Sequence, residues 1–146
     1  MRVAGRINAL YLAAIAGVIV VAVLLFMGRE SLNSVGGRFM SALAKGDVDA
    51  LTKMSYMGDK TPAEIHKKWE FAVNDAAKYY RFGWRISATS EPEPNVSGTV
   101  RLQVERNLGS GGSYEENFQL PMVMKNGGWK VDVGGISREM YPALPR

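Results

Sequence analysis

The chain has 146 residues and a net charge of +4, and its sequence contains no cysteine. A chain of this length has room for one membrane-spanning segment and one domain of ordinary size. The lack of cysteine excludes disulfide bonds, thiolate metal sites and a cysteine nucleophile. The positive charge is small and forms no continuous basic stripe along the sequence, so we expect no nucleic-acid partner.

The first pattern along the chain is an apolar run from Ile7 to Met27. As a helix, this run would be roughly 31 Å long, close to the thickness of the hydrocarbon core of a bilayer. It is longer than the apolar part of a secretory signal peptide, and it ends in large side chains at positions 24–27 rather than in small ones. The run therefore predicts an uncleaved membrane anchor, with a cleaved signal peptide as the alternative.

The charges on either side of this run predict its orientation. Arg2 and Arg6 precede it, whereas Arg29 and Glu30 nearly cancel each other after it. Positively charged flanks stay on the cytoplasmic side of a membrane. We therefore expect residues 1–6 in the cytoplasm, a single pass through the cell (inner) membrane, and an extracytoplasmic C-terminal domain.

Within the run, the small residues Ala9, Ala13 and Gly17 recur every four positions. Small residues on one face of a helix let a second membrane helix approach closely. They are also common in spanning helices that have no partner. This stripe is the candidate site of membrane helix packing, and it is the main indication of a membrane protein partner or a homo-oligomer.

Three further helices are predicted after the run. Residues 31–45 carry apolar side chains at helical spacing, Gly46 is a suitable C-terminal stop, and Asp47 is a suitable N-cap for a short second helix. Thr61–Glu64 reads Thr-Pro-Ala-Glu, which is a capping box with proline at the first helical position. It begins a long amphipathic helix that we expect to extend to Tyr80.

After Arg81 the period of the apolar residues changes to two, which predicts β-strands. Four such segments follow, near residues 82–89, 99–105, 114–125 and 129–133. Glu91–Asn95 contains two prolines and predicts a turn, and Asn126-Gly127 predicts a tight hairpin. The expected fold class is α+β: an N-terminal transmembrane helix, then a cone of three helices and a curved four-stranded antiparallel sheet.

Two short motifs resemble those of small bacterial, membrane-anchored members of the nuclear transport factor 2 superfamily, the cystatin-like cone. Phe39–Asp47 is similar to their opening helix that ends in Gly-Asp, and Asn126–Val131 is similar to their closing G-x-W-x-V strand. The resemblance implies a domain over residues 31–136, followed by an irregular tail over residues 137–146. It implies no particular function, because the same cone occurs in isomerases, dehydratases, transport factors and assembly domains of secretion systems.

Enzymes that resemble ketosteroid isomerase place an acid, a base or a tyrosine inside this cone. The strand positions predicted to face the interior are apolar in this chain, apart from Glu116 near the end of a strand. A polar group buried there without a partner would be costly, so a chain keeps one there only where it is needed. The residues predicted to line a pocket in the cone are Trp69, Tyr80, Trp84, Phe118, Met122 and Trp129.

His66 and Glu116 are the candidate polar residues at the rim of that pocket, although both fit ordinary surface positions as well. His66 is the only histidine of the chain, so neither a serine triad nor a multi-histidine metal site can be assembled. The sequence therefore predicts no catalytic residue, no cofactor and no metal.

These patterns favour a membrane-anchored, extracytoplasmic, non-catalytic binding or assembly module. Its expected partners are the lipid bilayer and a membrane protein complex in which it is an accessory subunit. Two alternatives stay open at this point. One is a binder of a small apolar ligand or lipid in the cone, and the other is an isomerase- or hydrolase-type enzyme that acts through Glu116, His66 or Tyr80.

Overall fold

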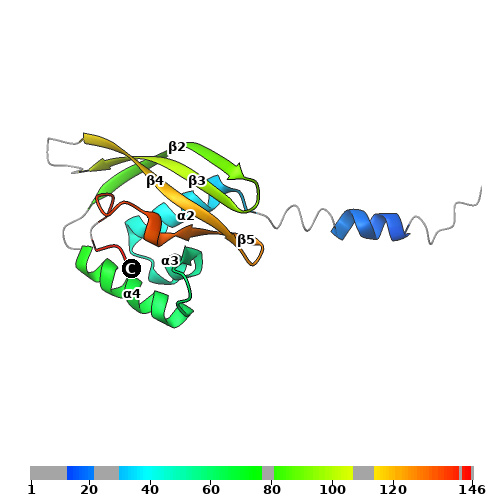
Figure 1. The fold of residues 1–146 in the computed structure, drawn as a ribbon, viewed down its shortest axis with the longest axis horizontal. Coiled ribbons are helices and arrows are strands. Elements are labelled where there is room, and N and C mark those ends of the chain that lie inside the picture. The colour runs from blue at the N-terminus through cyan, green and yellow to red at the C-terminus, as the bar shows by residue number, and fades with distance from the viewer. Residues whose placement is uncertain (1–12, 22–29, 77–80, 107–113, 142, 146) are drawn as a thin grey trace, which may run out of the picture. The chain divides into compact units, whose positions relative to one another are not determined.

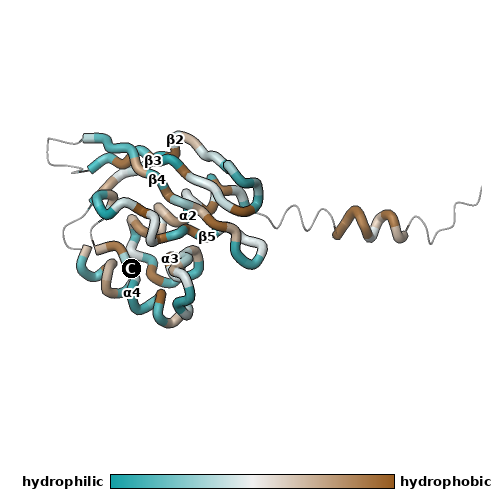
Figure 2. Tube along the Cα trace, in the orientation of Figure 1, coloured by the Kyte–Doolittle hydropathy of each residue, from teal (hydrophilic) through white to brown (hydrophobic). Residues whose placement is uncertain are grey.

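The computed structural model of the chain describes residues 13–21, 30–76, 81–106, 114–141 and 143–145 (Figure 1). The chain divides into two compact units, Met1–Glu30 and Ser31–Arg146. In the first unit residues 13–21 are helical, and Figure 2 shows this helix to be apolar. No helix within the described residues is both long and apolar enough to cross a membrane. The rest of Ile7–Met27 lies outside the described residues, so the membrane anchor stays a prediction.

The second unit is an α+β domain, as the sequence predicted. Its helices are α2 (Leu32–Lys45), α3 (Val48–Met54) and α4 (Pro62–Ala76). Its strands are β1 (Ser55–Tyr56), β2 (Phe82–Glu93), β3 (Ser97–Arg106), β4 (Tyr114–Lys125) and β5 (Gly128–Asp132), and the short 3-10 helix η1 (Val133–Gly135) follows. The strands form one sheet in the order β1-β5-β4-β3-β2. Helix α2 packs against β2, β3 and β5, while α4 packs against α3 (Figure 1).

The ends of α2 and α3 lie where the sequence places them. The backbone N–H of Ser34 donates to the Ser31 hydroxyl at 3.1 Å, which caps the start of α2. Gly46 ends this helix in the left-handed conformation, with φ of 70°. The backbone N–H of Ala50 then donates to Asp47 Oδ1 at 3.1 Å and caps α3. Each contact satisfies a backbone group that the helix itself leaves without a partner.

The capping box at the start of α4 is also confirmed. The backbone N–H of Thr61 donates to Glu64 Oε2 at 2.7 Å, and the backbone N–H of Glu64 donates to Thr61 Oγ1 at 3.3 Å. Pro62 occupies the first helical position, where a missing N–H breaks no helical hydrogen bond. The predicted end of this helix at Tyr80 lies outside the described residues.

Strand β2 is longer than predicted. It continues through Glu91-Pro92-Glu93, which the sequence assigned to a turn, and the turn lies at residues 94–96 instead. The register with β3 shifts just before Glu93. Strand β2 is at the edge of the sheet, and its pairing with β3 is already irregular near Pro92. The missing N–H of Pro92 therefore removes no hydrogen bond from a regular strand pair. Asn95 makes the reversal with a positive φ of 60°.

The sheet has five strands, so the expected four-stranded antiparallel sheet is wrong by one strand. Ser55 and Tyr56 form β1 and pair in parallel with Val131 and Asp132 of β5. A strand of two residues has no alternating pattern that a sequence could reveal. The hairpin between β4 and β5 is confirmed: Asn126 and Gly127 both have positive φ, as a type I′ hairpin turn requires.

The start of the C-terminal tail is part of the folded domain. Met140 and Tyr141 are 1% and 4% exposed, and both belong to the hydrophobic core. The Tyr141 ring meets Phe82 edge-on, with 6.2 Å between the ring centroids. The tail therefore packs against the domain from which it emerges.

Candidate functional site

The inner face of the sheet, which α2 covers, is filled by apolar side chains. Val100, Leu102 and Val104 of β3 are 0% exposed, and so is Leu120 of β4. The residues that meet them from the helices and the tail are also almost completely buried: Val35, Phe39, Met40, Leu51 and Met140. The interior of the cone is therefore a packed core.

The predicted pocket-lining residues belong to this core. Trp69, Phe118, Met122 and Trp129 are between 0% and 8% exposed, and Trp84 is partly buried against the same cluster. Tyr80 lies outside the described residues. They belong to one hydrophobic core cluster, so these side chains are part of the packed interior, and their role as a pocket lining stays a prediction.

One buried polar contact lies inside this core. The Trp69 indole N–H donates to the Ser55 hydroxyl at 2.8 Å, and the Ser55 hydroxyl donates to the Leu51 carbonyl at 2.6 Å. The Phe39 ring meets Trp69 edge-on at 5.9 Å. The sequence can indicate that a tryptophan is buried and that its indole N–H therefore needs an acceptor. Ser55 was not predicted as that acceptor, because nothing along the chain links it to Trp69.

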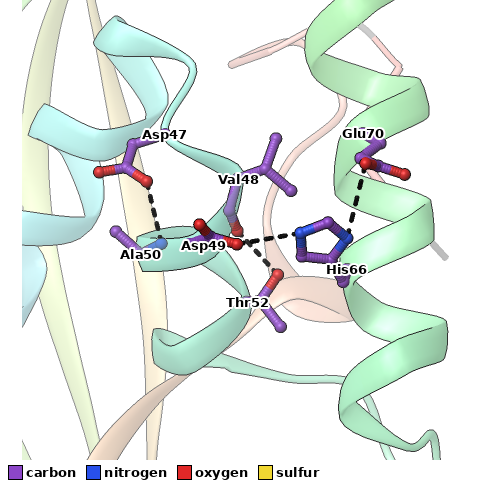
Figure 3. A network of polar contacts seen from close by, with 7 residues as sticks. All are labelled: Asp47, Val48, Asp49, Ala50, Thr52, His66 and Glu70. Carbon is purple, nitrogen blue, oxygen red and sulfur yellow. Dashed lines mark hydrogen bonds and ion pairs between the residues drawn. The ribbon is translucent and has the colours of Figure 1, made fainter.

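His66 points from α4 toward α3 and lies between two carboxylates (Figure 3). Its Nε2 is 3.0 Å from Asp49 Oδ1 of α3, and its Nδ1 is 3.7 Å from Glu70 Oε1, one turn along α4. The His66 side chain is 38% exposed. The arrangement links α3 to α4 at the surface and does not open into the core.

Glu116 lies on β4 and belongs to a different contact network. Its Oε2 is 3.3 Å from Nη2 of Arg106 on the neighbouring strand β3. The Arg106 guanidinium in turn lies over the Phe118 ring, 5.2 Å from its centroid. The two predicted rim residues thus belong to separate polar contacts: His66 contacts carboxylates of α3 and α4, and Glu116 pairs with Arg106 across two strands.

The predicted packing stripe of the first unit is described only in part. Ala13 and Gly17 lie in the helical residues 13–21 and are exposed there. A side chain at Gly17 would meet nothing within 4 Å. Ala9 lies outside the described residues. The stripe thus keeps an open face in its described part, and helix packing there stays a prediction.

A surface groove that the sequence did not predict lies between α4 and the C-terminal tail. It has a volume of about 740 Å³, and we call it the α4–tail groove. Its lining residues are Glu64, Lys67, Lys68, Phe71, Arg138, Ala143, Leu144 and Pro145. The capping box affects the carboxylate of Glu64: the Thr61 backbone N–H, which donates to Glu64, lowers the pKa of Glu64 below its ordinary value of 4.5. The groove was missed because one wall is a tail without a regular period.

Within the part of the chain that the structure describes, no three histidine, cysteine or acidic side chains gather in a way that could hold a metal ion. Two smaller surface hollows contain polar side chains as well. One lies between α2 and α3, and the other lies on the outer face of β3 and β4. Neither brings His66 and Glu116 together.

No protein-family model and no curated protein matches the sequence. Solved structures do share its fold. A SEC-C motif containing protein from Rhodopseudomonas palustris is similar with a TM-score of 0.51 and 17% identity, over 70% of this chain and 75% of that one. A putative calcium/calmodulin-dependent protein kinase type II association domain from Thiobacillus denitrificans is similar with a TM-score of 0.51 and 10% identity, over 69% of this chain and 89% of that one. Identities this low show the fold alone, which is nuclear transport factor 2-like, as the two motifs indicated.

Proposed function

We propose that this chain is a non-catalytic binding and assembly domain, held at the extracytoplasmic side of a membrane by its Ile7–Met27 segment. The observation that supports the non-catalytic part best is the packed inner face of the sheet. An acid or base must come within hydrogen-bond reach of the atom it protonates or deprotonates. In this fold the natural place for such a group is the cone interior, where this chain has apolar side chains.

The contacts of the two ionisable candidates favour the same reading. His66 bridges α3 and α4 through carboxylates, and Glu116 pairs with Arg106 across two strands. Neither contact network includes a residue of the other. An isomerase or hydrolase mechanism through these residues therefore has little support.

A small apolar ligand inside the cone also has less support than a protein partner. The residues that would line its site, Trp69 and Met122, are 0% and 1% exposed because they pack against other side chains. Opening a ligand-sized space would require several large side chains to leave a close-packed core. A protein partner needs no such change, because it can use the surface.

The membrane part of the proposal depends on the sequence and is tested by fractionation. We expect the full chain to stay in the membrane fraction after alkaline washing, and a phosphatase fused after Arg146 to be active outside the cytoplasm. Val18→Arg places a charge in the middle of the apolar run and should release the chain, whereas Val18→Leu should not. Recovery of the unaltered chain in the soluble fraction would contradict the anchor.

The assembly part is tested by crosslinking in intact cells, followed by purification of the full chain in a mild detergent. We expect crosslinked complexes, and we expect Ala13→Leu with Gly17→Leu to reduce them because large residues on the stripe keep helices apart. Ala14→Leu with Val18→Leu is the matched control away from the stripe. A chain that is always a lone monomer, with no crosslinked product, would end the proposal.

A further inference from the structure

The α4–tail groove has one wall on a helix and the other on the tail. Lys67 and Phe71 lie one turn apart on α4, and Arg138 and Leu144 belong to the tail. A volume of about 740 Å³ lies within the range of ordinary ligand and peptide side-chain sites, which is roughly 300–1,000 Å³. The groove is thus large enough to receive two or three side chains of a partner.

The tail wall is held in place before any partner arrives. Met140 and Tyr141, which lie between Arg138 and Ala143 of this wall, are buried in the core, and Pro145 is buried as well. Between them Ala143 has φ of 59°, the left-handed region that alanine rarely adopts. A wall that carries buried residues on each side of Ala143 loses less conformational freedom when a partner binds than a free tail would, which favours affinity.

The groove exposes an aromatic side chain. Phe71 is 74% exposed, the highest value among the exposed large apolar residues of the described Ser31–Arg146 unit. The buried side of α4 carries Ile65, Trp69 and Ala72, so Phe71 is not needed to pack this helix on the domain. Aromatic residues at the centre of a concave surface commonly carry much of the binding energy when a partner covers them.

The charges of the groove determine which partner fits. Among the described lining residues, Lys67, Lys68 and Arg138 are basic and Glu64 alone is acidic. The carboxylate of Glu64 already accepts the Thr61 backbone N–H. A groove whose described lining is both net positive and partly apolar is complementary to a segment that carries carboxylates beside an apolar residue.

We propose that the α4–tail groove binds a short acidic segment of a partner protein, with a large apolar side chain of that segment against Phe71 and its carboxylates near Lys67 and Arg138. This inference rests on the proposed assembly function and names the chemistry of the partner. A protein segment fits the concave shape better than a flat bilayer does.

The test measures peptide binding to the full chain in detergent by fluorescence anisotropy. The probes are labelled peptides with a central phenylalanine flanked by glutamates, by glutamines or by lysines. We expect the glutamate peptide to bind most tightly and its affinity to fall as salt is added. Phe71→Ser should weaken its binding by about tenfold or more, while Val96→Ser, at another exposed apolar position, should leave binding unchanged.

Charge reversal separates recognition from a merely structural role. Lys67→Glu with Arg138→Glu should reverse the preference, so that the lysine peptide binds better than the glutamate peptide. Lys53→Glu, at an exposed lysine on α3 outside this groove, should keep the original order. Equal binding of the three peptides, or a charge-reversed variant with the original preference, would overturn the proposal.

Anionic vesicles of phosphatidylglycerol in phosphatidylcholine provide the competing outcome. If such vesicles bind the groove and displace the glutamate peptide while the Phe71 and charge variants abolish vesicle binding, the groove recognises lipid and the proposal is wrong.

The crosslinking experiment described above distinguishes failure of the groove proposal from failure of the proposed assembly function. Complexes that form unchanged with the groove variants would overturn only the groove, whereas no complex with the unaltered chain would overturn the assembly function.

Discussion

Two adjacent glycines in α2 have different surroundings, so replacing each by alanine should change the stability of the domain differently. A Cβ added at Gly36 would lie 3.0 and 3.1 Å from the two methyl carbons of Val100. A Cβ added at Gly37 would lie 3.8 Å from the Trp84 ring and 3.9 Å from the Ile86 δ-methyl, which are ordinary contact distances. The helix approaches the sheet more closely at the first glycine than at the second.

The magnitudes follow from helix propensity and packing. Replacing glycine by alanine inside a helix stabilises it by about 1 kcal/mol. Gly37→Ala should give this whole gain, because its methyl group meets no obstacle. At Gly36 the methyl group would press on Val100, which is 0% exposed and has a branched, stiff side chain. Overpacking typically costs about 1–3 kcal/mol, so Gly36→Ala should be between neutral and about 2 kcal/mol destabilising.

The assay is urea unfolding of the full chain in detergent, followed by far-ultraviolet circular dichroism. We expect the midpoint to rise for Gly37→Ala and to stay or fall for Gly36→Ala, with the same slope for both. Equal stabilisation by the two substitutions would refute the close approach of α2 to β3. Destabilisation by Gly37→Ala would show that its surroundings are tighter than the distances to Trp84 and Ile86 imply.

Three further substitutions test other contacts. Ser55→Ala leaves the buried Trp69 indole N–H without its acceptor and should cost about 1–3 kcal/mol in chemical denaturation; a change below about 0.5 kcal/mol would contradict this hydrogen bond. Glu64→Ala should lower the thermal midpoint near neutral pH, and the difference from the unaltered chain should shrink as the pH falls below 4.5. The reason is that the lowered pKa of Glu64 stabilises the fold fully above its ordinary value of 4.5, and this stabilisation is lost as the pH falls through the pKa of the folded state; a constant difference would contradict this. Ala143→Gly should stabilise the chain by roughly 0.5–1 kcal/mol, since glycine adopts a positive φ without strain, and a loss of stability would argue against this conformation.

The sequence predicts the local features of the domain well. The cap at Asp47, the capping box of Thr61 and Glu64, and the turn at Asn126-Gly127 all involve partners within a few residues of each other. Such contacts depend on residue type and spacing alone, so they can be read along the chain. The apolar alternation of β3 similarly determined which side of that strand is buried.

The extent of β2 shows where local rules fail. Pro92 is typical of turns, yet it lies in a strand because β2 is at the edge of the sheet. Edge position depends on which strands pair, and pairing joins distant parts of the chain. The same reason explains why β1 was missed, since Ser55 and Tyr56 become a strand only beside β5.

The candidate site was decided almost entirely by tertiary structure. The sequence showed that the inner strand positions are apolar, and this was enough to predict a fold with little room for chemistry inside the cone. It did not show that Trp69 would donate to Ser55, or that Phe71 and Arg138 would line one groove. Each of these contacts joins segments far apart in the chain, whose meeting depends on how the whole core packs, whereas caps and turns depend only on neighbours along the backbone.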